Sequence, residues 1–68
     1  MITATISQEA KKLVIRVKNN IVGIITEPCK ETNYRYEVNV HGTKRVTRSL
    51  PDAVLMFDDL TDSRYCVI

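Results

Sequence analysis

The densest group of acidic side chains in the sequence consists of Asp58, Asp59 and Asp62. Paired carboxylates can transfer protons to a substrate or bind a hard cation such as Mg²⁺ or Ca²⁺. Neither the spacing of a calcium-binding loop nor that of a zinc-dependent hydrolase accompanies these residues. The pattern therefore favours a solvated helix end, and we expect neither a metal nor a cofactor.

One histidine and two cysteines are the other residues whose types suit catalysis. His41 stands beside Gly42, and the sequence places neither an orienting carboxylate nor a nucleophile next to it, which favours a turn residue over a general base. Cys29 and Cys66 are too few and too far apart for a disulfide framework, and without a CxxC pair a zinc site is not expected. We predict that the protein is not an enzyme, unless residues from two chains meet in a shared site.

Basic side chains follow several segments that we expect to be strands, and they are the candidate nucleic-acid contacts. These are Arg16, Arg35, Lys44, Arg45 and Arg48. If Arg16, Arg35 and Arg45 share one face of a sheet, they form a positive surface that can contact phosphates. Glu37 interrupts this surface and the net charge is only +2, which favours protection of strand edges by Lys and Arg. Nucleic-acid binding is the alternative function.

Alternating apolar and polar residues predict strands in the first part of the chain. Residues 2–6 form a first strand, and residues 13–18 and 21–25 form a hairpin with a two-residue turn at Asn19-Asn20. The glycine inside this hairpin indicates either a bulge or a close approach of the backbone.

The segments at 34–40 and 44–48 form a second hairpin, whose loop length decides which residues face each other. A two-residue turn pairs Val46 with Glu37, whereas a three-residue loop pairs Val46 with Val38. We expect the three-residue loop, because it places apolar side chains opposite each other.

The segment after Ser49 predicts a helix that ends near Leu60 or Thr61. Ser49 and Pro51 are typical of a helix N-terminus. Apolar residues recur at helical spacing, and they are Leu50, Ala53, Val54, Phe57 and Leu60. The adjacent Leu55 and Met56 fall outside this stripe.

Together these elements predict a single small α+β domain over residues 1–68, with an antiparallel β-sheet of hairpins in a meander and one C-terminal helix packed on one face. Residues 64–68 either fray or add a short edge strand. The order over residues 34–60, a Tyr-x-Val strand, a Gly turn, a Lys-Arg strand and a helix containing Ala53, resembles the small sheet-plus-helix DNA-binding domains at the N-terminus of phage-type integrases. This resemblance implies a fold and covers no recombinase domain, so we base no function on it.

The composition is that of an ordinary globular protein, with 44% hydrophobic and 26% charged residues. The first residues lack the basic and apolar regions of a signal peptide, so we expect a cytoplasmic protein without membrane contact. A chain of this size buries only about 60% of the surface that its unfolded form exposes. Because so thin a core is often supplemented by a partner chain, we expect a homodimer.

Apolar residues left over from the expected core are the candidate protein interface. They are Leu55, Met56, Tyr65, Val67 and Ile68. Exposed apolar area on a small protein usually marks a contact, and Tyr and Met are enriched at protein interfaces. We therefore predict a small non-enzymatic interaction protein that modulates a protein partner by surface contact, of a kind often found in phages and other mobile elements.

Overall fold

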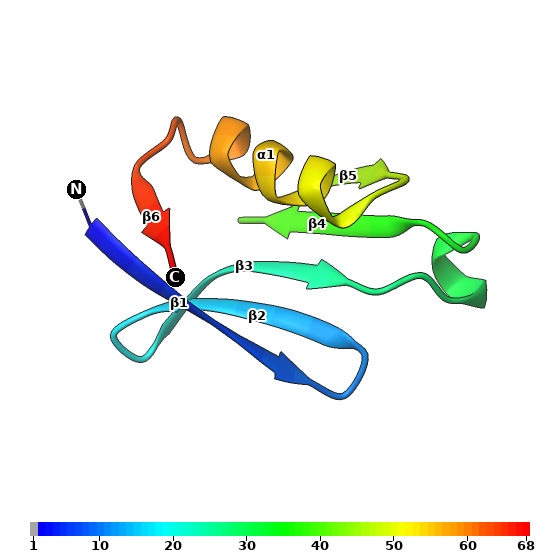
Figure 1. Ribbon diagram of the computed structural model, residues 1–68, viewed down its shortest axis with the longest axis horizontal. Coiled ribbons are helices and arrows are strands. Elements are labelled where there is room, and N and C mark those ends of the chain that lie inside the picture. The colour runs from blue at the N-terminus through cyan, green and yellow to red at the C-terminus, as the bar shows by residue number, and fades with distance from the viewer. Residues whose placement is uncertain (1) are drawn as a thin grey trace.

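The computed structural model describes residues 2–68 and shows one six-stranded sheet with one α-helix packed against it (Figure 1). Its elements are β1 (Ile2–Glu9), β2 (Lys12–Val17), β3 (Asn20–Thr26), the 3-10 helix η1 (Lys30–Thr32), β4 (Tyr36–Val40), β5 (Thr43–Thr47), α1 (Leu50–Leu60) and β6 (Tyr65–Val67). The order across the sheet is β5-β4-β3-β2-β1-β6. This arrangement confirms the predicted small α+β fold. In the described part of the chain no helix is long and apolar enough to cross a membrane.

The hairpin of β2 and β3 forms as predicted, but its turn lies one residue earlier than expected. Lys18 and Asn19 form the turn, and Val17 pairs with Asn20 across it. Lys18 takes the left-handed conformation, with φ of 56°. Asn20 is therefore the first residue of β3 and not part of the turn.

A β-bulge in this hairpin partly offsets the shifted turn. Ile15 pairs with Gly23, whereas the next residue, Arg16, pairs with Ile21, which leaves Val22 without a partner. Such an extra residue bends a strand and re-aims its side chains. Val22 is buried in the core, so the bulge adds an apolar side chain to the interior.

The predicted register of β4 and β5 is wrong. Val46 pairs with Glu37 and not with Val38, because His41 and Gly42 alone form the turn, with φ of 50° and 85°. Two residues with positive φ give a turn whose twist matches that of the flanking strands. Strand β5 lies at the sheet edge and is mostly exposed. The predicted register would therefore gain no core contact that could compensate for its less favourable three-residue loop.

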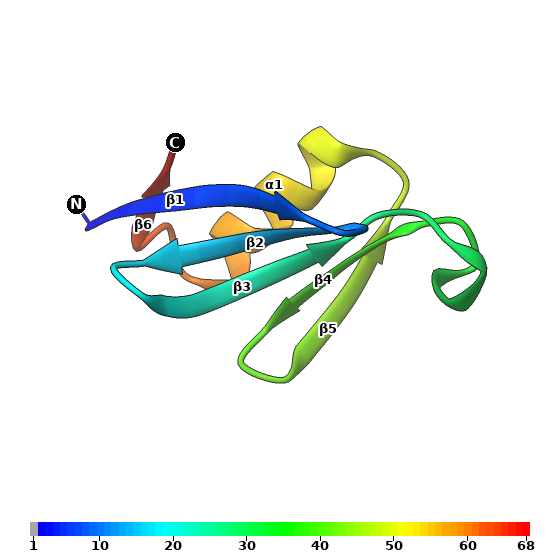
Figure 2. The ribbon, with the colours of Figure 1, turned by 90° about the horizontal axis from the view of Figure 1, so that it is seen from below.

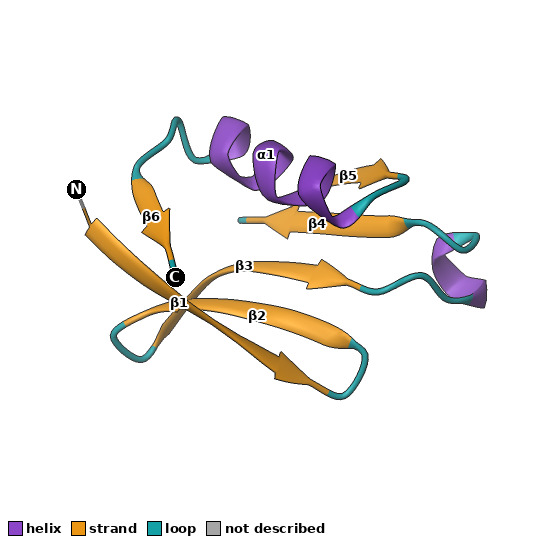
Figure 3. Cartoon of the chain, in the orientation of Figure 1, coloured by secondary structure: helices purple, strands orange, loops and turns teal. Residues whose placement is uncertain are grey.

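Strand β6 extends the sheet at its other edge, beside β1 and parallel to it. The final segment therefore adds an edge strand, and the sheet is mixed where a purely antiparallel one was predicted. Helix α1 carries the chain from β5 back across the sheet, and residues 61–64, a teal loop in Figure 3, lead into β6. Figures 1 and 2 show the sheet curling so that β6 lies near the C-terminal half of α1.

Helix α1 begins and ends as predicted. Ser49 Oγ accepts a hydrogen bond from the N–H of Asp52 at 3.3 Å, which satisfies one free N–H of the first turn. At the other end, Thr61 Oγ1 donates to the carbonyl of Phe57 at 2.9 Å. Ala53 and Phe57 are completely buried, so the middle of the predicted apolar stripe faces the sheet, whereas Leu50 at its start is 37% exposed.

The ring of Phe57 in α1 lies directly against Gly23 of β3. A Cβ atom on this residue would lie 2.5 Å from Cε1 and 2.8 Å from Cδ1 of Phe57. Phe57 is completely buried, so its ring cannot swing into solvent to relieve such a contact. Both readings of the glycine are confirmed, since it borders the bulge and also permits a close approach.

We predict that Gly23→Ala destabilises the protein by about 1–3 kcal/mol, the usual range for overpacked cores. Urea unfolding followed by circular dichroism measures this free energy. Phe57→Leu makes room beside residue 23, so the double variant should lose less stability than the two single variants added together. Strictly additive losses would show that the ring does not oppose the new methyl group.

Candidate interaction groove

A groove runs between the C-terminal half of α1 and strand β6, and its volume is about 310 Å³. The residues that line it are Val54, Asp58, Ser63, Tyr65, Cys66 and Val67. We call it the α1–β6 groove. It offers apolar side chains on both walls and one carboxylate, a combination that suits contact with another polypeptide.

The helix wall of the groove follows from helical spacing. Val54 and Asp58 lie four residues apart and therefore share one face of α1. This face adjoins the one on which Ala53 and Phe57 enter the core, and Val54 itself packs partly against the core. The groove wall is thus a continuation of the packed helix face.

The strand wall depends on a tight turn after α1. Asp62 and Ser63 both have φ of 54°, a left-handed conformation that costs residues other than glycine roughly 1–2 kcal/mol each. The N–H of Ser63 donates to the carbonyl of Asp58 at 2.7 Å and helps to hold this turn. The chain then reverses, and the ring centroid of Tyr65 lies 6.2 Å from that of Phe57.

Two of the five predicted interface residues line this groove, and two more directly follow a lining residue in the sequence. Tyr65 and Val67 line the groove and are partly buried. Leu55 and Ile68 are 64% and 75% exposed. Whether these residues bind a partner stays a prediction.

The fifth residue, Met56, corrects the predicted helix pattern. It packs against the core, although the sequence placed it outside the apolar stripe. Met56 lies three residues after Ala53 and four before Leu60, so it borders the buried face. The face of α1 covered by the curled sheet is therefore wider than the predicted stripe.

Sequence reasoning missed Val54, Asp58 and Ser63 as groove residues. Val54 was assigned to the helix stripe and Asp58 to a solvated helix end. Both become a groove wall only because β6 lies opposite them, and no local pattern reports that contact. Cys66, which also lines the groove, is a free thiol, as is the partly buried Cys29.

A smaller cavity of about 140 Å³ lies at the end of α1 and collects polar side chains. The residues that line it are His41, Leu60, Thr61, Asp62, Arg64 and Tyr65. His41 reaches it from the β4–β5 turn, so its predicted position in a turn is confirmed. The acidic group of the sequence is divided between two sites, because Asp58 lines the groove and Asp62 lines this cavity. Within residues 2–68 no cluster of three His, Cys, Asp or Glu side chains is placed to hold a metal ion.

The candidate nucleic-acid contacts do not form one surface. Arg45 pairs with the buried residue Val38 and therefore lies on the helix side of the sheet, whereas Arg16 lies on the opposite, open face. The two-residue turn shifts the register of β5 by one residue, which turns each of its side chains to the other face. Arg35 precedes β4 and Arg48 follows β5, so both lie outside the strands. The expected shared face of Arg16, Arg35 and Arg45 is therefore wrong.

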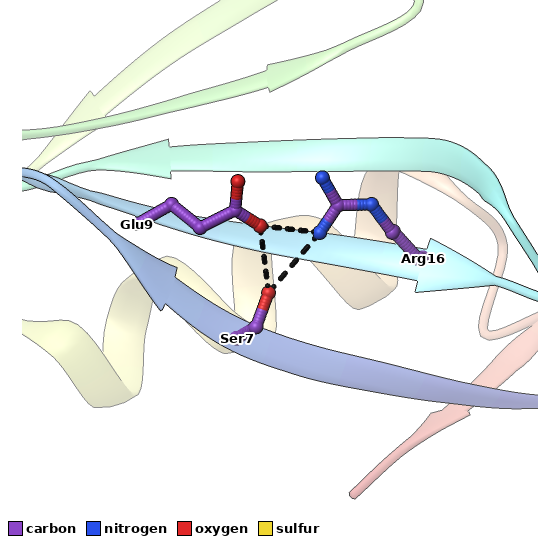
Figure 4. A network of polar contacts seen from close by, with 3 residues as sticks. All are labelled: Ser7, Glu9 and Arg16. Atoms are coloured by element: carbon purple, nitrogen blue, oxygen red, sulfur yellow. Dashed lines mark hydrogen bonds and ion pairs between the residues drawn. The ribbon is translucent and has the colours of Figure 1, made fainter.

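Two basic side chains on the open face are paired with carboxylates. Arg16 Nη1 donates to Glu9 and, at 3.1 Å, to the hydroxyl of Ser7, which in turn donates to Glu9 at 2.9 Å (Figure 4). Lys44 Nζ lies 3.9 Å from Glu37 Oε1. These pairs reduce the positive potential that a phosphate would meet. Contact of individual basic residues with nucleic acid stays a prediction.

No protein-family model, curated protein or solved structure matches this chain. The resemblance to integrase domains therefore stays an expectation from the sequence, and function has to be argued from the surfaces described above.

The hydrogen bond from Arg16, with a smaller effect of Ser7, lowers the pKa of the Glu9 carboxyl below its ordinary value of 4.5. Because the folded pKa is the lower one, the pairing stabilises the fold above pH 4.5 and loses this contribution as the pH falls through the folded pKa.

In an NMR titration of the carboxyl, Arg16→Gln should raise the pKa of Glu9 toward 4.5. Lys44→Gln, which removes a charge from the same face, should change it much less. Equal effects of the two variants would assign the shift to net charge and not to the pair.

Proposed function

We propose that this chain is a non-enzymatic protein-binding protein and that the α1–β6 groove is its binding site. The observation that carries the proposal is a groove with apolar walls beside an edge strand that has a neighbour on one side only. Its volume of about 310 Å³ falls in the range of clefts that hold ligands. Burial of apolar area is the main favourable term in most protein association.

Several exposed apolar residues follow a groove residue in the sequence or pair with one across the sheet. Leu55 follows Val54 along α1, and Ile68 follows directly after β6. Ile2, which is 48% exposed, pairs with Tyr65 across β1 and β6. If these side chains form a contiguous apolar area, that area is characteristic of an interaction site.

We assign no chemical step to the groove. Its ionisable side chains are Asp58, Tyr65 and Cys66, and His41 lines the other cavity. Nucleophilic catalysis requires a base within hydrogen-bond reach of the nucleophile. The proposed action is therefore steric, in that the protein modulates a partner by occupying a surface of it.

A peptide-display selection on the immobilised protein tests the binding site. Selected peptides should shift the NMR amide resonances of β6 and of the C-terminal half of α1. Val54→Lys places a charge in the apolar wall and should weaken these peptides by about tenfold or more. Val46→Lys makes the same change at a 51% exposed position of β5 and should leave the affinity within about twofold. Selected peptides that bind Val54→Lys as tightly as the parent protein would rule out the groove.

Self-association is a separate part of the proposal. We expect sedimentation equilibrium to show a concentration-dependent homodimer, because a core as small as this one is often supplemented by a second chain. Leu55→Ser should weaken the dimer, whereas Ile21→Ser, at a 52% exposed residue next to Arg16 of the open face, should not. A monomer at all concentrations would remove the homodimer and leave the groove free for another partner.

A further inference from the structure

The sheet has two edges, and the outward backbone groups of β5 are partly occupied. In a two-residue hairpin the residues next to the turn bond to each other, and bonded pairs then alternate along the ladder. Val40 pairs with Thr43 at this turn, so Lys44 and Val46 direct their N–H and C=O groups outward. Arg45 Nη1 donates to the carbonyl of Lys44 at 3.0 Å. A side chain of β5 itself therefore covers part of this edge.

The outward backbone groups of β6 are arranged differently. Ile68 bonds to β1 through both of its backbone groups, since its N–H donates to Ala4 at 3.0 Å and its C=O accepts from Ile6 at 3.3 Å. In a parallel ladder every second residue bonds to the same neighbouring strand. Tyr65 and Val67 therefore direct their N–H and C=O groups away from β1.

These groups face the α1–β6 groove. Strand β1 covers one edge of β6, and α1 forms the opposite wall of the groove. The lining includes Cys66 as well as Tyr65 and Val67, although successive side chains of a strand point to opposite faces. A groove along the edge of β6 is bordered by both sets of side chains, which agrees with this lining. The groove thus runs along the free edge of the strand.

We propose that the α1–β6 groove binds an extended, basic peptide segment, which adds to β6 as a seventh strand of the sheet. This inference rests on the proposed function, and it specifies the conformation and the charge of the partner. Main-chain hydrogen bonds to Tyr65 and Val67 hold the segment in register, and its alternate side chains contact the apolar walls, including Val54. Lys and Arg at the intervening positions have long, flexible side chains that extend around the segment toward the acidic end of α1.

The charge of the partner follows from the charges around the groove. Asp58 lines it, and Asp59 and Asp62 follow at the same end of α1. The C-terminus of a helix carries a partial negative charge, and the last turn of α1 contains no basic residue to offset it. Arg64 is near in sequence, but it lines the cavity with His41 and not the groove. A basic segment therefore complements the groove, and an acidic one is repelled.

The binding experiment uses three synthetic peptides with blocked ends: one in which valine alternates with lysine, one in which valine alternates with glutamate, and a copy of the first in which every backbone nitrogen is methylated. We expect the lysine peptide to bind about tenfold or more tightly than the glutamate peptide. It should also slow hydrogen exchange of the Val67 N–H by about tenfold or more, because this amide gains a partner. The N-methylated peptide, which cannot donate from the altered positions, should bind weakly.

Two matched variants test the charge. Asp58→Lys should reverse the preference between the lysine and glutamate peptides. Asp59→Lys makes the same change one residue further along, at an exposed position outside the groove lining, and should keep the preference. Equal effects of the two variants would reduce the selectivity to the net charge of the protein and would overturn the assignment to Asp58.

The outcomes separate this inference from the proposed function. If the display-selected peptides bind at the groove but leave the Val67 N–H unprotected, strand addition is wrong and the binding site stands. If tight binding survives N-methylation, strand addition is again wrong. If neither the selected nor the synthetic peptides shift the resonances of β6 and α1, both the strand addition and the binding site are wrong.

Discussion

The position of α1 on the sheet depends on the contact between the ring of Phe57 and the backbone of Gly23. A side chain at residue 23 would occupy the space of the ring, so the absence of one allows the helix to approach. The same ring lies beside Tyr65, which ties the first residue of β6 to the helix. One aromatic side chain therefore connects the middle of the sheet, the helix and the last strand. The α1–β6 groove is the space that remains beyond this contact.

The two edge strands of the sheet, β5 and β6, differ in what surrounds their unpaired backbone groups. Strand β5 carries Lys44 and Arg45, and the guanidinium of Arg45 bonds to an outward carbonyl. Charged side chains on an edge strand oppose pairing with another chain. Strand β6 contains three residues, Tyr65 to Val67, none of which is charged, and its edge lies in a groove next to α1. Charged side chains therefore oppose pairing at the edge of β5, whereas the groove beside α1 limits access to the edge of β6.

The sequence was sufficient to predict α1, because its start, its apolar spacing and its end agree within one short segment. The turns were less predictable, since moving a turn by one residue changes only the conformational energy of a few neighbouring residues. In the β2–β3 hairpin, a bulge partly compensates for the shift of the turn. In the β4–β5 hairpin, β5 is mostly exposed, so the conformation of the turn at His41 decides the register.

The groove could not be predicted at all from local patterns. Val54 and Asp58 are ordinary helix residues in the sequence, and their opposite wall comes from the pairing of β6 with β1. That pairing is non-local, and it is parallel where the alternation of the hairpins indicated an antiparallel sheet. Two of the candidate interface residues, Tyr65 and Val67, nevertheless line the groove, because surplus apolar residues of the C-terminal segment are visible in the sequence itself.

The pairing of β1 with β6 also bears on the order in which the chain folds. Ile2 and Tyr65 stand near opposite ends of the chain, so their pairing closes a loop of almost the whole length, and the entropy cost of closure grows with loop length. The hairpins close short loops, and local contacts of this kind form fastest. We therefore expect β6 to dock last and to detach first in local unfolding. Since β6 is one wall of the groove, occupation of the groove and completion of the fold are a single linked equilibrium, in which a ligand of the closed form shifts the chain toward its fully folded state.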